Sequence, residues 1–535
     1  MPTIVGDSSK AAAAAVMLPA STTRTNIDIA LTRSITKFSL DVIQILDHLS
    51  NYTPELYPVE WRNRSANSAP ERTNRVARPR ISSSSLILFA TSLAFIIICL
   101  DVTVVNVALE RIQSSLGTNI TGLQWVLNAY TLAFASLLLS TGALGDRFGP
   151  KPIMITGLAL FTLASLACGL SDSIELLITA RVFQGVAAAL CVPSSLALLN
   201  STFSEPKARA RAIGIWAGTA SIALGAGPIV GGLMVDRFGW PSIFLINLPF
   251  GALGIWLAAV YAPAVKAASG RSLDLAGQIL AILALAGLTV GFVESGELGW
   301  TLPVVVTGFV DFLVLGSSFL LIEARHKEPM LPLSLFRSPT VSVTSTIGLL
   351  LNFGYYGLMF AISLFFQIGK GYSPLSAGLA FLPMTALISV TNFVSGSLAA
   401  RMGPKLPILM GLSMAAIGYF SIAGIDRDTA YVFVMVPLMI IGIGVALTVP
   451  AISILLLSGA DRSQAGIASG VFNAARQIGG VVGVGVFGSL LAGSPDNIIT
   501  GIHIALALSG SGMVLAFVIA VLGLRERRRR VITAR

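Results

Sequence analysis

The chain has 535 residues, of which 54% are hydrophobic and only 11% are charged, and its mean hydropathy is +0.83. Soluble domains carry about 25% charged residues, so this composition excludes a soluble protein and indicates a polytopic membrane protein. The net charge of +10 does not indicate nucleic-acid binding, because half of it lies in a basic tail, residues 524–535. Such a tail is typical of a helix end beside anionic lipid headgroups.

Residues 1–84 precede the first long apolar segment and form a predicted cytoplasmic tail. Between Leu31 and Leu49 apolar residues recur at helical spacing, which suits an amphipathic helix on the membrane surface. The tail has no long apolar stretch of the kind found in secretory signal peptides. Two interpretations stay open. The segment is an interfacial helix, or it is a dispensable tail or the result of a start site assigned too far upstream.

Segments apolar and long enough to cross a bilayer, which takes about 20 residues, recur fourteen times after residue 84. They lie near 85–109, 122–144, 152–170, 175–200, 212–234, 242–260, 275–293, 302–322, 341–366, 376–399, 406–424, 430–456, 466–491 and 501–523. Loops predicted on the inner side carry thirteen Lys and Arg residues, against four on the outer side. The positive-inside rule therefore predicts that both termini are cytoplasmic.

An internal repeat organises these spans. The segment Gly142–Lys151 returns as Gly396–Lys405, with six of ten positions identical at an offset of 254 residues. The same offset places spans two to five on spans ten to thirteen, whereas spans seven and eight have no counterpart. We therefore predict a six-helix half at 85–260, an inserted pair with its flanking loops at 261–340, and a second half at 341–523. Duplicated halves are typical of transporters, with the substrate path between them.

Several motifs in chain order resemble the major facilitator superfamily, and within it the fourteen-helix drug:proton antiporter branch. They are Leu100–Leu109, the Gly142–Lys151 loop, Arg181–Gly185 with Pro193, Gly225–Gly232, Trp240–Pro249 and Asn473–Gly480. The resemblance covers residues 85–524. It implies an all-α major facilitator fold of fourteen transmembrane helices, an inner- or plasma-membrane location, a monomer, and export of drug-like molecules in exchange for protons, with no cofactor other than the proton gradient. In the second loop copy Ala400 replaces the acidic residue, which is a departure from the pattern.

Two charged residues in the first half are expected to face each other inside the membrane. Asp101 is seventeenth in an outward-running span and Arg181 is seventh in an inward-running one, so both lie at similar depth in the outer part of the bilayer. Charges there cost about 2.5–3.5 kcal/mol each and are usually functional. The offset maps Asp101 onto Tyr355 and Arg181 onto Met435, so the pair exists in one half only. It is either the proton-coupling site or a static ion pair between helices one and four.

Two glycine motifs carry expectations about movement. Gly225, Gly227, Pro228, Gly231 and Gly232 predict a kinked, tightly packed hinge, because proline removes a backbone donor and glycines allow close helix contact. Ordinary helix packing is the alternative. The family loop implies a latch between the halves, formed by Gly142, Asp146, Arg147, Gly149 and Lys151, in which a carboxylate faces a helix N-terminus. A solvated turn is the alternative.

Further polar or aromatic residues are candidates for the substrate cavity: Trp125, Asn128, Tyr130, Gln184, Asn352, Tyr355 and Arg476. Arg476 either faces the cavity or donates to backbone carbonyls. Asp311, inside the inserted pair, is a proton or cation site or a polar contact to the preceding helix. Cys99, Cys168 and Cys191 fall within spans and are expected to be small core residues.

The remaining function classes are limited by what the sequence lacks. We find no phosphate-binding Gly-x-x-x-x-Gly-Lys-Ser/Thr loop and no His/Cys spacing typical of a metal site. Export driven by an ion gradient is therefore the favoured function. Proton-coupled uptake of a small metabolite is the alternative within transport. A membrane enzyme or receptor is the other alternative, although the loops are short and poor in histidine.

Overall fold

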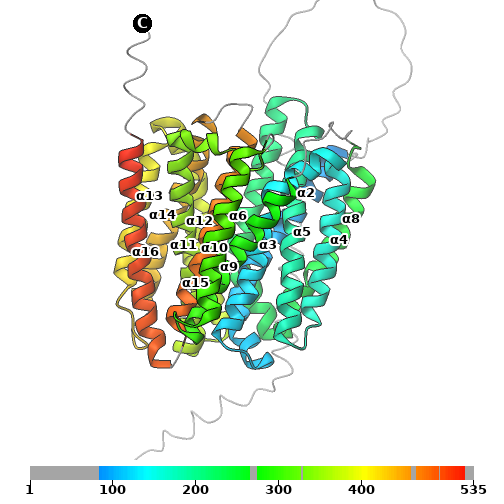
Figure 1. Cartoon of the computed structure of the whole chain (residues 1–535). Helices are drawn as coiled ribbons and strands as arrows, with labels where there is room; N and C mark the ends of the chain where they lie inside the picture. Colours follow the sequence, from blue (N-terminus) through cyan, green and yellow to red (C-terminus); the bar gives the residue numbers. More distant parts are fainter. Residues whose placement is uncertain (1–82, 265–273, 327–328, 460–464, 493–494, 525–535) are drawn as a thin grey trace, which may run out of the picture. The chain divides into compact units, whose positions relative to one another are not determined.

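The computed structural model describes residues 83–264, 274–326, 329–459, 465–492 and 495–524, and every regular element within them is helical (Figure 1). Thirteen of these helices are long and apolar enough to cross a membrane. The all-α, multi-pass fold is thus confirmed. Helix α3 (Ile120–Phe148) covers the predicted span 122–144 but is not among the thirteen, so the number fourteen stays a prediction. The predicted amphipathic segment and the basic tail after residue 524 lie outside the described residues.

The other helices follow the predicted order closely. The first half contains α2 (Ser83–Leu116), α4 (Pro150–Gly169), α5 (Ile174–Thr202), α6 (Pro206–Phe238), α7 (Ser242–Leu245) and α8 (Asn247–Tyr261) in addition to α3. The inserted pair is α9 (Leu275–Leu298) and α10 (Pro303–Arg325), followed by the short η1 (Leu333–Arg337). The second half contains α11 (Pro339–Leu364), η2 (Phe365–Gly369), α12 (Pro374–Met402), α13 (Lys405–Ile422), α14 (Tyr431–Gly459), α15 (Ala465–Leu491) and α16 (Pro495–Gly523).

The two loop copies turn the chain with the same backbone device. Gly149 and Gly403 have φ values of +87° and +81°, a region that favours glycine, and each ends a long helix. Each is followed by a proline, Pro150 and Pro404, which restricts the chain as the next helix begins. The Gly-Pro pair of the sequence repeat is therefore what the turn requires.

Both halves pack their helices in the same way. In the first half α2 contacts α5, α6 and α8, α3 contacts α5, and α4 contacts α5 and α8. The corresponding helices of the second half repeat these pairings: α11 contacts α14, α15 and α16, α12 contacts α14, and α13 contacts α14 and α16. The halves meet where α6 packs against α12 and where α15 packs against α3. Because α15 is the counterpart of α6 and α12 is the counterpart of α3, these two seams are equivalent. This is the arrangement that a duplication with an approximate twofold axis produces.

The inserted pair docks at the seam between α3 and α15, where it crosses the middle of the view in Figure 1. Helix α9 follows α3 along its length: Gln278 Nε2 donates to the Ser136 carbonyl (2.7 Å) near one end, and Trp125 Nε1 donates to Glu294 Oε1 (2.8 Å) near the other. Helix α9 continues to Leu298, past the predicted end at residue 293, and Glu294 lies in this last part of the helix.

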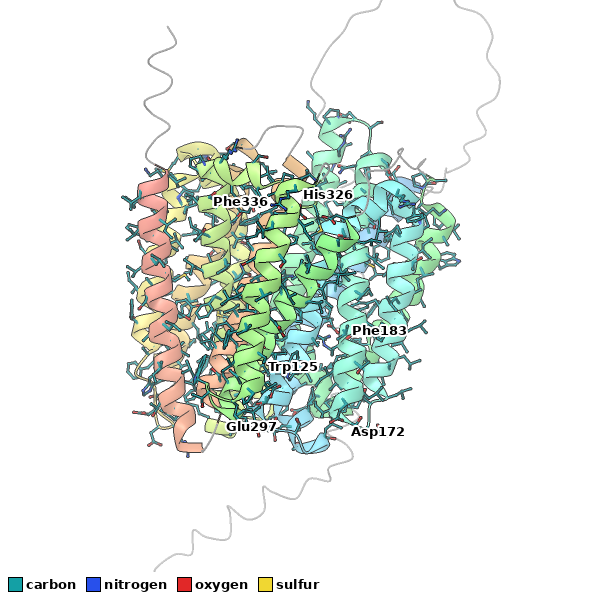
Figure 2. The ribbon with its side chains drawn as sticks, in the orientation of Figure 1. Trp125, Asp172, Phe183, Glu297, His326 and Phe336 are labelled. Carbon is teal, nitrogen blue, oxygen red and sulfur yellow. The ribbon has the colours of Figure 1, made fainter. Side chains whose placement is uncertain are left out.

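We call the end of the bundle with the Gly149 and Gly403 turns the inner end, following the predicted topology, and the opposite end the outer end. Figure 2 shows His326 and Phe336 at the first of these ends, and Asp172, Glu297 and Trp125 toward the second. These positions agree with the alternation of the predicted spans. The orientation of the bundle in the membrane remains a prediction.

Candidate functional site

Asp101 on α2 and Arg181 on α5 form an ion pair in the core of the first half. The Arg181 Nη1 donates to Asp101 Oδ2. Both side chains are buried, with 0% of the Asp101 surface and 1% of the Arg181 surface exposed. Arg181 Nε also donates to the Val126 carbonyl of α3 (3.0 Å), and its guanidinium lies 4.3 Å from the centre of the Tyr130 ring. Three helices are thus joined by one arginine side chain.

Amide groups complete the environment of the Asp101 carboxylate. Its Oδ1 accepts from Gln184 Nε2 (3.3 Å) on α5 and from Asn247 Nδ2 (3.4 Å) at the start of α8. The Gln184 Oε1 in turn accepts from Arg181 Nη1 (2.9 Å), and Ser165 Oγ on α4 accepts from Gln184 and Asn247. Both oxygens of the carboxylate are thus hydrogen-bonded, one to a guanidinium and the other to two neutral amides.

The two glycines Gly227 and Gly231 bring α6 close to α2. A Cβ added to Gly227 would stand 1.8 Å from Thr103 Oγ1, and one added to Gly231 would stand 3.0 Å from the Val104 backbone. Thr103 and Val104 lie two and three residues after Asp101, so α6 packs against the stretch of α2 that carries Asp101. The predicted close packing is therefore observed, and α6 remains one helix from Pro206 to Phe238 through Pro228.

The same segment of α6 also contacts the second half. A Cβ added to Gly232 would stand 2.6 Å from the Pro374 carbonyl, and one added to Gly378 of α12 would stand 2.1 Å from the Pro228 carbonyl. At the other seam, Gln124 Nε2 on α3 donates to the carbonyls of Val484 (3.2 Å) and Gly485 (2.9 Å) on α15. These contacts lie toward the outer ends of the helices, so the halves are joined there.

Toward the inner end several helix faces stand in open space. A Cβ added to Gly142 or Gly145 of α3, to Gly214 or Gly218 of α6, or to Gly396 of α12 would meet no atom within 4 Å. These glycines therefore make no close helix contact, unlike Gly232 and Gly378 at the seam between the halves.

The residues of the predicted latch have different surroundings. Lys151 Nζ donates to the carbonyls of Ala259 (2.9 Å) and Ala262 (2.8 Å) and so caps α8 within the first half. Arg147 is exposed and lies 5.5 Å from the ring centre of Phe148. The side chain of Asp146 lies outside the described residues. The latch therefore remains a prediction.

The candidate cavity residues are dispersed. Gln184 and Tyr130 belong to the buried Asp101–Arg181 network, and Trp125 is directed to Glu294 of the inserted pair. Asn128 is buried with its Nδ2 unpaired, and Asn352 Nδ2 donates to the Gly348 carbonyl one turn earlier (2.9 Å). Tyr355 lies beside Tyr356, with ring centres 5.6 Å apart.

A cavity of about 670 Å³ opens at the outer end between both halves and the inserted pair. Its polar lining includes Glu110, Asn119, Glu297 and Gln367. Its α2 residues, Glu110, Gln113 and Ser114, lie further toward the outer end than Asp101 does. Asp311 is not part of it: the side chain is exposed on α10, and its Cβ lies 3.0 Å from a Cβ added to Gly287 of α9.

Several network members were not singled out from the sequence. Ser165 and Cys168 carry no sequence signal, whereas Asn247 lies in the Trp240–Pro249 motif and could have been noticed there. A second buried acidic pair, Asp274 and Glu323, was also missed because both residues lie at span ends. Glu323 Oε2 accepts from the Leu331 amide (3.1 Å), so it anchors the loop that leads to the second half.

These features define a class of protein: a multi-pass α-helical membrane protein with two equivalently packed halves, an inserted helix pair and a buried charge pair in one half. The Major Facilitator Superfamily model matches residues 91–484, and the chain belongs to this family. It is therefore a member of a transporter family that moves small molecules.

The similar proteins agree with this assignment. The chain is 39% identical to a methylenomycin A resistance protein of Streptomyces coelicolor over 413 residues, which cover 77% of this chain and 87% of that protein. It is 38% identical to the multidrug resistance protein Stp of Mycobacterium tuberculosis, with 76% of each covered. Its fold is similar to the crystal structure of a bacterial homologue of the human lysosomal transporter Spinster, in an inward-facing and unoccupied conformation (TM-score 0.59, 17% identity, covering 83% of this chain and 98% of that chain).

Proposed function

We propose that this protein exports amphipathic, drug-like small molecules from the cell in exchange for protons. Two relatives at 38–39% identity are named for resistance to an antibiotic or to several drugs, which supports export over uptake. The protein acts as a monomer in the inner or plasma membrane with both termini cytoplasmic, and the proton gradient is its energy source.

The observation that carries this proposal is the buried Asp101–Arg181 pair, present in the first half only. A proton on Asp101 removes its charge and weakens its bond with Arg181, which then keeps its bonds to the Val126 carbonyl and to Gln184. Because Arg181 joins α2, α3 and α5, its release from α2 alters the packing of the helices that line the path between the halves. Protonation is thereby coupled to the exchange of inward and outward access.

The seam contacts of Gly232, Gly378 and Gln124 join the halves toward their outer ends, which supports a state that receives its substrate from the cytoplasm. In the next step the outer contacts of α6 with α12 and of α3 with α15 separate. A proton then enters from outside and reaches Asp101, which is fully buried in the present state.

The test is accumulation of a fluorescent drug in cells with and without the protein, followed by addition of an uncoupler. We expect lower accumulation in cells that contain the protein and loss of this difference with the uncoupler. Drug-induced proton movement should then be measured in inverted vesicles. Higher accumulation in cells with the protein would indicate uptake, and a difference that persists with the uncoupler would contradict proton coupling.

A further inference from the structure

Arg476, near the middle of α15, is a cation within a predicted span that has no ionic partner among the described residues. Its Nε–H is buried and donates no hydrogen bond, and no carboxylate within the described part of the chain pairs with it. Its electrostatic neighbours are the Tyr356 phenol and the Cys99 thiol, groups that are ordinarily neutral at pH 7. The remaining contact is the Phe472 ring, whose centre is 5.7 Å from the guanidinium carbon.

The other arginine inside a span has the opposite environment. Arg181 pairs with Asp101 and donates to Gln184 and Val126, so its charge and its donors are satisfied by the protein. An unpaired charge in a membrane interior is costly, and such residues usually mark a substrate or ion pathway. Within the described residues the chain thus supplies a carboxylate to one guanidinium and none to the other.

The electrostatic neighbours of Arg476 come from both halves. Its neighbour Cys99 belongs to α2 of the first half, and Tyr356 belongs to α11 of the second half. A Cβ added to Gly348 of α11 would stand 3.1 Å from Arg476 Cγ, so α11 packs on the stem of the side chain, and one added to Gly480, four residues further along α15, would stand 2.9 Å from the Tyr356 ring. Helix α15 contacts α3 of the first half as well as α11 of the second, so Arg476 lies on a helix of the seam between the halves.

We infer that Arg476 binds the acidic group of the exported molecule, and that the preferred cargo is an amphipathic organic anion. A carboxylate or acidic phenol pairs with the guanidinium fork, and an aromatic body packs against Phe472, Tyr355 and Tyr356. This inference rests on the proposed export function and narrows its substrate class.

Charge movement follows from this assignment. Each proton that enters carries one positive charge inward, and each negative charge that leaves adds another. Export of an anion is therefore driven by an inside-negative potential as well as by the pH gradient, whereas one-for-one exchange of a monocation with a proton moves no net charge.

The experiment uses the purified full chain in proteoliposomes and two dyes that share a xanthene core, anionic fluorescein and cationic rhodamine 123. We expect the wild-type protein to transport fluorescein faster, and an imposed potential to increase this transport. In Arg476→Gln the fluorescein-to-rhodamine transport ratio should fall at least about tenfold, while Arg476→Lys, which keeps the charge, should lose about threefold. Arg337→Gln removes an exposed charge elsewhere and is the matched control, with a ratio equal to that of the wild type.

The outcomes separate the two proposals. If the wild type transports rhodamine 123 with proton exchange but not fluorescein, or if Arg476→Gln keeps the wild-type ratio, the anion site is wrong and proton-coupled export stands. Equal loss of both dyes in Arg476→Gln would show a structural role for the residue and would also overturn the inference. If neither dye moves and neither elicits proton movement in the wild type, the proposed export function fails as well.

Discussion

Replacement of Asp101 by asparagine tests the coupling site most directly. The substitution keeps the shape of the side chain and one acceptor oxygen for Gln184 and Asn247, but it removes the group that takes up the proton. We expect drug-induced proton movement to fall to the level of liposomes without protein. Transport of a drug down its own concentration gradient tests whether the variant still binds and moves substrate.

The cost to stability can be assessed from the same contacts. Removal of one member of a buried ion pair typically costs about 3–5 kcal/mol, because the remaining charge is left uncompensated. Arg181 keeps the Val126 carbonyl, the Gln184 oxygen and the Tyr130 ring, so we expect a loss of about 3 kcal/mol, at the lower end of this range. The loss is measured as a lower unfolding temperature in detergent.

A double variant separates coupling from folding. Asp101→Asn with Arg181→Gln removes both charges, so most of the lost stability should return, whereas proton coupling should not. Lysine at position 181 keeps the charge, so Arg181→Lys should impair transport less than Arg181→Ala does. The lysine cannot reach all of the groups that Arg181 Nε and Nη1 contact, so some impairment should remain. Proton movement at wild-type amplitude in Asp101→Asn, with a neutral drug, would show that the pair is only structural and that coupling occurs elsewhere.

Three further predictions concern the seam, the inserted pair and the topology. Gly378→Ala places a methyl group against the Pro228 carbonyl and should lower the free energy of unfolding by about 1–3 kcal/mol and reduce export. Gly396→Ala, on the same helix but with no atom within 4 Å of the added methyl group, is the control and should be tolerated. Normal export by Gly378→Ala would contradict the tight outer seam. In Glu323→Gln the amide can donate to the unpaired Asp274 oxygen, so this variant should keep the wild-type unfolding temperature. Glu323→Ala should unfold at a lower temperature. Equal unfolding temperatures for the wild type and Glu323→Ala would contradict the anchoring role. Reporter fusions in the α8–α9 and α10–α11 loops should both indicate the cytoplasm, and an external signal from either would mean that the inserted pair is misplaced.

The sequence determined the architecture, because the bilayer imposes a simple length and hydropathy rule on every span. The Gly142–Lys151 repeat located the two halves, and the depth of Asp101 and Arg181 along their helices was sufficient to predict that they face each other. The glycines of α6 predicted a close contact, because a glycine in a membrane helix lets a neighbouring helix approach its backbone.

The tertiary structure decided which partners each group has. Hydropathy and periodicity describe one helix at a time, so they could not show that Gln184 and Asn247 complete the Asp101 site, that Trp125 is directed to Glu294, or which surface of the bundle the inserted pair covers. Arg181 and Arg476 look alike in the sequence, as single arginines within apolar spans. Only the packing of residues distant in the chain gives one of them a carboxylate and leaves the other with none among the described residues. The free energy of a buried charge depends on what surrounds it in space.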